Sequence, residues 1–303
     1  KSRLNYIIVE NNSGRSAVKA KYIIDCTGTG HVVSKTELPV IMRNERDGEL
    51  QPMTLFFKLG GIDTDQFNVL MAEDGVRYAN PMLRKLLSFE MESGRLQNFG
   101  GPWAVFGSTI RKGELSVNAT RYRGNAADGF DLSDAERQLR KDVFEMIRVF
   151  KENVPAMKDC YLIETATQVG IRETRGIVGE YMISGNDILE AKKFDDSVAL
   201  GGHPVDIHRA GNQNQDVSFL KEPYQIPFRS LIPRGSVNLL VAGGCISATR
   251  EAFASIRVQA QCMALGQAAG TASALGVEKE VQISKLDVSL LVKTLEGQKA
   301  IVS

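Results

Sequence analysis

The sequence has few of the residues that build disulfide frameworks and metal centres. Its 303 residues include four cysteines and three histidines. The cysteines are spread singly, with no C-x-x-C pair and no Cys/His cluster at the spacing of metal ligands. They stand at Cys26, Cys160, Cys245 and Cys262. We therefore expect neither a disulfide framework nor a structural zinc site, and we assign no metal.

An excess of charge of either sign is also absent. Lys plus Arg number 37 and Asp plus Glu number 36, which gives a formal net charge of +1 at pH 7. Because no basic stripe is present, nucleic acid is not expected as a partner, and an enzyme that modifies tRNA is disfavoured. The most apolar stretch, residues 251–276, contains Arg257 and several glutamines, so it predicts a buried helix and no membrane span.

A start signal is missing too. The first residues, Lys1-Ser2-Arg3, are neither an initiator methionine nor the beginning of a signal peptide with an apolar core. We expect the natural N-terminus to lie upstream, so that the chain is the C-terminal portion of a longer protein. We favour a cytoplasmic location, while an export signal ahead of Lys1 stays open.

The residues that are present predict an ordinary globular α/β protein, with 43% hydrophobic and 24% charged residues. Residues 6–10 and 17–24 are β-rich and are separated by a polar connection that predicts a hairpin. Residues 22–26 then form an apolar run without alternation, which predicts a buried parallel strand ending at Thr27-Gly28-Thr29-Gly30. A second short apolar run, residues 236–244, ends in Gly243 and Gly244.

The middle of the chain predicts a mixed region of helices and strands. Strands are expected at 54–58, 104–110 and 115–120, and helices near 65–72 and 81–93. A capping box at 133–136 predicts the start of an amphipathic helix that ends before Pro155. A further turn and helix is expected over 186–201, a long loop over 203–223, and helices over 255–274 and after a cap at 284–287.

Several short motifs, each weak alone, occur in an order and spacing that resemble the FAD-dependent oxidoreductases with a glutathione-reductase-type flavin domain. The closest resemblance is to a bacterial group in which a substrate domain is inserted between two flavin-domain segments. The motifs are Ile24-Asp25-Cys26-Thr27-Gly28, Gln51-Pro52-Met53-Thr54, Asn118-Ala119-Thr120-Arg121, Gly170-Ile171-Arg172-Glu173-Thr174-Arg175, Gly179-Glu180-Tyr181, Pro204-Val205-Asp206-Ile207-His208, and the runs over 224–233, 238–244 and 257–270.

The resemblance implies an α/β fold, namely a partial Rossmann-like FAD-binding domain with an inserted α+β substrate domain. Residues 1–45 and 225–303 would form the discontinuous FAD-binding domain, and residues 46–224 the substrate or cap domain. The sequence departs from the family at one point, because no G-x-G-x-x-G unit follows an early strand. We expect that unit upstream, and tight FAD binding by this chain alone is therefore in doubt.

The same resemblance implies a set of cofactor-binding residues at the ends of the two apolar strands. They are Thr27, Gly28, Gly243, Gly244, Ser255, Ile256 and Arg257. A glycine at a strand end lets the backbone pass close to FAD, and a helix starting at Ser255 would present its N-terminus to the flavin ring. The alternatives are a plain tight turn at Gly28 and a packing helix after Ser255.

Two groups of polar residues are candidates for catalysis. Arg172 and Arg175 could hold a carboxylate or polarise a carbonyl, although a buried ion pair between the domains explains them equally well. Asp206 and His208 would share one face of an extended strand, near His203, and an Asp-oriented histidine suits general acid or base chemistry. A loop held by side-chain hydrogen bonds is the alternative for this second group.

We therefore predict a flavoenzyme that transfers a hydride between a small organic or carbohydrate-like substrate and N5 of FAD. The competing hypothesis is a non-catalytic module that kept the fold and binds a ligand or partner without FAD. Cys245, beside the second glycine turn, is either reactive or simply packed, as most lone buried cysteines are. The substrate, the electron acceptor and a homo-oligomeric state are all left open by the sequence.

Overall fold

The computed structural model describes residues 2–44, 48–73, 81–105, 109–210 and 215–303. The chain divides into two compact units. Unit 1 comprises Lys1–Asp47, Thr174–Ile207 and Asp216–Ser303, and unit 2 comprises Gly48–Glu173 and His208–Gln215. The expected boundaries differ from this division, since residues 174–207 were placed with the substrate domain and pack in unit 1. Their strands find their hydrogen-bonding partners there, which short sequence patterns do not reveal.

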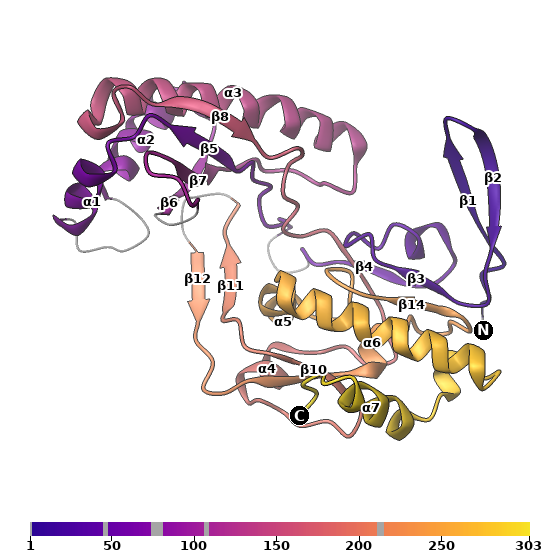
Figure 1. The fold of residues 1–303 in the computed structure, drawn as a ribbon. Helices are drawn as coiled ribbons and strands as arrows, with labels where there is room; N and C mark the ends of the chain where they lie inside the picture. Colours follow the sequence, from indigo (N-terminus) through magenta and orange to yellow (C-terminus); the bar gives the residue numbers. More distant parts are fainter. Residues whose placement is uncertain (1, 45–47, 74–80, 106–108, 211–214) are drawn as a thin grey trace. The chain divides into compact units, whose positions relative to one another are not determined.

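Unit 1 is built around two short parallel strands, β3 (Ile23–Asp25) and β14 (Leu239–Val241), shown in Figure 1. The predicted hairpin precedes them as β1 (Tyr6–Asn11) and β2 (Gly14–Lys19). Two further pairs are antiparallel: β4 (Val40–Met42) with β9 (Arg175–Ile177), and β10 (Ser197–Gly201) with β13 (Tyr224–Pro227). The helices are α4 (Gly185–Leu189), α5 (Arg250–Ile256), α6 (Gln259–Glu278) and α7 (Val288–Gly297).

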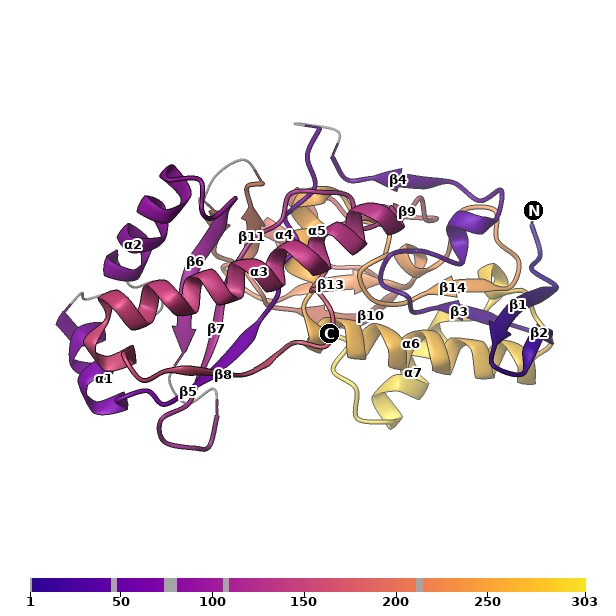
Figure 2. The same ribbon diagram turned by 90° about the horizontal axis from the view of Figure 1, so that it is seen from above.

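Unit 2 is an antiparallel four-stranded sheet in the order β6-β7-β5-β8. The strands are β5 (Phe57–Gly60), β6 (Phe99–Val105), β7 (Leu115–Thr120) and β8 (Tyr161–Thr165). The described residues of the unit include the α-helices α1 (Thr64–Glu73), α2 (Pro81–Glu92) and the long α3 (Gly129–Asn153). Figure 2 shows α3 running along the sheet, and the apolar side chains of β5 and β7 pack with those of α3 in one core.

The structure corrects four of the expected element boundaries. Helix α3 begins four residues before Ser133, because the Asp128 carboxylate caps it by accepting the N–H groups of Phe130 and Asp131. Strand β6 lies earlier than the expected 104–110, of which 106–108 fall outside the described residues. The expected helix over 186–201 is the short α4 followed by strand β10, and the expected loop over 203–223 contains β11 (Val205–His208) paired with β12 (Gln215–Ser218).

The fold is thus a mixture of helices and small sheets, with separate apolar cores in the two units. No helix of the described residues is long and apolar enough to cross a membrane.

Candidate functional site

Asp25 ends β3 and organises the loop that follows it. Its buried carboxylate accepts hydrogen bonds from the Thr27 N–H at 3.0 Å, the Thr27 hydroxyl at 2.6 Å and the Val33 N–H at 3.0 Å. Hydrogen bonds to an ionised carboxylate are among the stronger ones in proteins. The loop therefore has a defined shape at the point where the sequence predicts a cofactor contact.

Gly28 lies in this loop with a backbone conformation that other residues rarely adopt. Its φ is +72°, in the left-handed region. Apart from Gly28 itself and its two chain neighbours, no atom of the described residues lies within 4 Å of the position that a Cβ would occupy here. Open space beside exposed peptide groups is what a ligand needs to approach the backbone closely.

The second glycine turn lies directly beside the first, because β14 runs parallel to β3 and both strands end at the same edge. Gly243 has a φ of +92°, and a Cβ on Gly244 would stand 3.0 Å from the Gly28 carbonyl oxygen. In open α/β sheets, ligands bind at the carboxyl ends of the strands. The structure brings together four residues predicted to contact the cofactor: Thr27, Gly28, Gly243 and Gly244.

Arg43 supports the second glycine turn from inside unit 1. Its guanidinium donates to the carbonyl oxygens of Gly244 at 3.1 Å, Ile246 at 2.6 Å and Ala248 at 3.2 Å. The ring of Phe253 lies 4.0 Å from its Cζ. The sequence reasoning missed Arg43, because no motif surrounds it and these three carbonyl partners are more than 200 residues away in the chain.

A family model described as FAD dependent oxidoreductase matches residues 1–295, nearly the whole chain. The chain belongs to the FAD-dependent oxidoreductase family. It is therefore an oxidoreductase, and FAD is its cofactor. Comparison with curated proteins and with solved structures gave no match.

The two glycine turns of this flavoenzyme fit a dinucleotide cofactor. Backbone N–H groups in turns with positive φ form concave sites that attract phosphate, and a Cβ at position 28 would occupy the open space beside such a turn. The hydrogen bonds of the Asp25 carboxylate and of the buried Arg43 hold the backbone of the two turns in a defined shape.

The predicted helix start at Ser255 is wrong. Ser255 and Ile256 are buried at the C-terminal end of α5, and Arg257 is the residue that follows that helix. The long helix α6 begins at Gln259, after the extended residue Val258. Neither proline nor glycine marks this break, so the sequence reads as one continuous helix.

Buried hydrogen bonds within unit 1 also engage Ser255. Its hydroxyl donates to the His203 carbonyl oxygen and lies 2.7 Å from the hydroxyl of Tyr224. Burial raises the pKa of Tyr224 to about 12, so this phenol stays protonated and can donate to Ser255. This chain of hydroxyl groups connects the end of α5 to the segment that carries His203.

His203 has a ring orientation suited to accepting a proton. Its Nδ1 lies 2.7 Å from the Pro204 carbonyl oxygen. A carbonyl oxygen can only accept, so Nδ1 carries the hydrogen, and in the neutral ring Nε2 keeps its lone pair. Three residues later, Asp206 faces Arg257, whose guanidinium lies 3.6 Å from the Asp206 carboxylate and donates to the Asp206 carbonyl at 3.1 Å.

Arg172 and Arg175 fall in different units, and residues 171–174, which include Arg172, belong to no strand. Arg172 donates to the Pro52 carbonyl oxygen at 2.7 Å within unit 2. Arg175 begins β9 in unit 1, where its carbonyl accepts from Arg43 at 3.4 Å.

His208, the last residue of β11, belongs to unit 2, whereas Asp206 belongs to unit 1. In unit 2 the His208 ring contacts Arg121, whose nitrogen lies 3.1 Å from the ring Nδ1. The His208 N–H donates to the side-chain oxygen of Gln51 at 3.0 Å. The sequence placed Arg121 and Gln51 within motifs but gave neither of them a role.

Cys245 is packed rather than reactive. It is fully buried after the second glycine turn, and its thiol faces the carbonyl oxygen of Asp25. Burial, together with the nearby negative charge of Asp25, raises its pKa to about 12. The thiolate needed for nucleophilic or redox chemistry is therefore strongly disfavoured.

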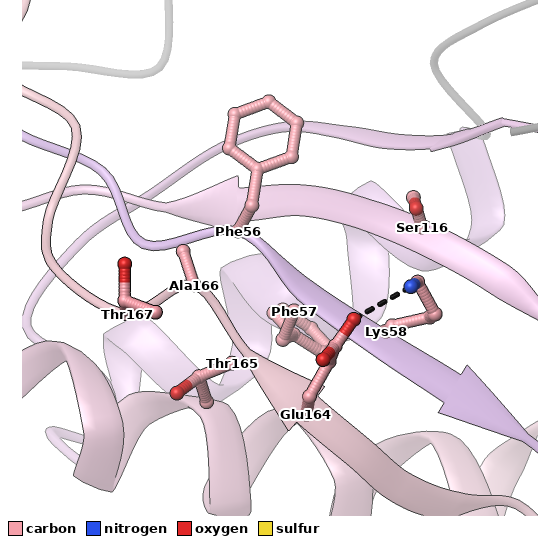
Figure 3. A pocket seen from close by; sticks show the side chains of 8 residues that line it. All are labelled: Phe56, Phe57, Lys58, Ser116, Glu164, Thr165, Ala166 and Thr167. Atoms are coloured by element: carbon pink, nitrogen blue, oxygen red, sulfur yellow. Dashed lines mark hydrogen bonds and ion pairs between the residues drawn. The ribbon is translucent and has the colours of Figure 1, made fainter.

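An open depression of about 270 Å³ lies on unit 2, and none of the residues that line it is a predicted site residue (Figure 3). It is lined by residues of β5, β7 and β8, among them Lys58 and Glu164, which form an ion pair at 2.6 Å. The side chain of Phe56 extends from its rim. Within the part of the chain that the structure describes, no group of three or more His, Cys, Asp or Glu residues could hold a metal ion.

Proposed function

We propose that unit 1 is the Rossmann-like part of the enzyme that holds FAD, through the backbone of Thr27, Gly28, Gly243 and Gly244. The observation that carries this proposal is the contact between the two glycine turns at the ends of parallel strands. Unit 2 would be the inserted part that contributes to substrate binding. The substrate would be a small organic or carbohydrate-like molecule that exchanges a hydride with N5 of FAD.

FAD, when bound, would supply the hydride acceptor, and the chain's own residues would then have to take the proton of the substrate hydroxyl. His203 is suited to take that proton, since its Nε2 lone pair is available when Nδ1–H is hydrogen-bonded to the Pro204 carbonyl. Tyr224 and Ser255 hold the His203 backbone in place. Arg257 is better suited to orienting this segment, through Asp206, than to contacting the cofactor.

Replacing Gly28 with alanine is expected to weaken FAD binding by at least about tenfold, equivalent to about 1.4 kcal/mol. Beyond its own chain neighbours the new methyl group would contact no atom of the described residues, so apart from backbone strain its steric effect falls on the ligand. The measurement uses the complete gene product. FAD is titrated into it, and its affinity is obtained from flavin fluorescence and visible absorption.

Gly14→Ala is the matched control, because Gly14 also has a positive φ, of +99°, and open space around its Cβ position. Both variants should lose a similar amount of stability, about 1 kcal/mol from backbone strain, but only Gly28→Ala should lose affinity. Equal affinity in the two variants, or a protein that shows no flavin bands with excess FAD, would remove the proposed role of the glycine turns.

A further inference from the structure

A second group of buried polar residues lies in unit 2 and centres on His208. Arg121 is 2% exposed, Gln51 is 1% exposed and His208 is 8% exposed. Arg121 reaches Nδ1 of His208 at 3.1 Å and also donates to the Arg209 carbonyl oxygen at 3.4 Å. Gln51 accepts the His208 N–H through its side chain, and the Gln51 N–H donates to the buried carboxylate of Glu173 at 2.8 Å.

The contact with Arg121 determines which ring nitrogen of His208 carries the hydrogen. A guanidinium has only N–H donors and keeps its charge at every accessible pH, so Nδ1 must be the acceptor. The neutral ring then has its hydrogen on Nε2. This arrangement is opposite to that of His203, whose Nδ1–H donates to a carbonyl and whose Nε2 is the acceptor.

We propose that Arg121 is a positioning residue that holds His208 as an Nε2–H hydrogen-bond donor. This inference rests on the proposed function. In that reaction the substrate carbon would change between alcohol and carbonyl. His208 would serve as a fixed hydrogen-bond donor to an oxygen of the substrate held on unit 2, and not as a base.

Arg121 differs in this respect from the buried Arg43. The contacts of Arg43 described above are with backbone carbonyl oxygens, and none of them is with a ring nitrogen. Arg121 donates an N–H to the Nδ1 atom of His208. The Nδ1 lone pair is then occupied by this hydrogen bond, and a basic histidine would need that lone pair to accept a proton there. The local backbone leaves room for it, since a Cβ on Gly100 would collide with the Arg121 side chain.

The experiment is ¹⁵N NMR of the protein with labelled histidine at about pH 8, where an unperturbed histidine is neutral. The chain has only three histidines, and the variants His31→Gln, His203→Gln and His208→Gln assign their signals. We expect the wild-type His208 ring to carry its hydrogen on Nε2, with a hydrogen-bonded, unprotonated Nδ1. A wild-type ring with its hydrogen on Nδ1 overturns the proposal without any variant.

Arg121→Met should shift the Nδ1 signal and allow Nδ1 to be protonated in part of the molecules. Arg123→Met is the matched control, because Arg123 lies two residues away, is largely exposed and pairs with Glu49. It should leave the His208 signals unchanged. Identical His208 signals in the wild type and the folded Arg121→Met variant also overturn the proposal.

Neither measurement requires FAD or a substrate, so its result is independent of the glycine-turn experiment. If the protein shows flavin bands but His208 has the opposite tautomer, the proposed function is retained and the role of Arg121 is rejected. If His208 has the expected tautomer but the protein binds no FAD, the geometry of His208 is confirmed and the proposed reaction is rejected.

Discussion

Replacing Arg43 with methionine is expected to lower the free energy of unfolding by about 4 kcal/mol, because the carbonyl groups that it serves would stay buried without their donor. These include the carbonyls of Gly244, Ile246 and Ala248, which form and follow the second glycine turn. The stacking of the guanidinium on Phe253 would be lost as well. Urea unfolding followed by circular dichroism measures the change.

The same variant should also weaken FAD binding, since the turn at Gly243 and Gly244 would lose the hydrogen bond that Arg43 donates to the Gly244 carbonyl oxygen. Arg15→Met is the control, because Arg15 is 70% exposed in the β1–β2 hairpin and pairs only with Glu10 among the contacts that the structure gives it. It should change stability by less than about 0.5 kcal/mol. An Arg43→Met protein as stable as Arg15→Met would show that the buried carbonyls find other donors.

Replacing Asp142 with asparagine is expected to stabilise the protein by about 2 kcal/mol near neutral pH. Asp142 is 1% exposed on α3, and burial raises its pKa from 3.8 to about 6, with Gln138 opposing the rise through a hydrogen bond. That difference corresponds to about 3 kcal/mol of destabilisation when the carboxylate is charged. Asparagine keeps the oxygen that accepts from Gln138 and removes the charge.

The effect has a definite pH dependence. The folded state binds the proton of Asp142 more tightly than the unfolded state, so the wild type loses stability as pH rises from about 4 to about 6. The advantage of Asp142→Asn should therefore shrink to about 0.5 kcal/mol at pH 4. Trp103, the only tryptophan, lies in unit 2 with α3, so its fluorescence reports the relevant unfolding.

Asp134→Asn is the control on the same helix, where the carboxylate is half exposed and pairs with Arg137. Its stability should follow the wild type at every pH within about 0.5 kcal/mol. A stabilisation by Asp142→Asn that persists unchanged at pH 4 would mean that relief of a buried charge is not its cause.

The expectations that held came from patterns confined to a few neighbouring residues. The polar connection between two β-rich runs predicted the β1–β2 hairpin, and the apolar runs ending in glycine predicted β3 and β14. These patterns work because a buried parallel strand needs apolar residues on both faces and its glycine turn needs positive φ. The ordered motifs then predicted the family, which the match over residues 1–295 confirms.

The expectations that failed depended on partners distant in the chain. The break between α5 and α6 carries no proline or glycine, and it lies where Ser255 bonds to the His203 segment and Arg257 to Asp206. The grouping of residues 174–207 with unit 1 follows from strand pairs whose members are far apart in sequence.

By itself, the sequence determined the two buried parallel strands, the glycine turns and the chemical class of the protein, because these follow from local geometry and from residue order. Only the tertiary structure decided what the polar side chains do. It buried Cys245, assigned Arg43 to the second turn and placed the histidines His203 and His208 against a carbonyl oxygen and a guanidinium. The reason is physical: a side chain's protonation and its hydrogen bonds depend on which atoms surround it, and those atoms come from distant parts of the chain.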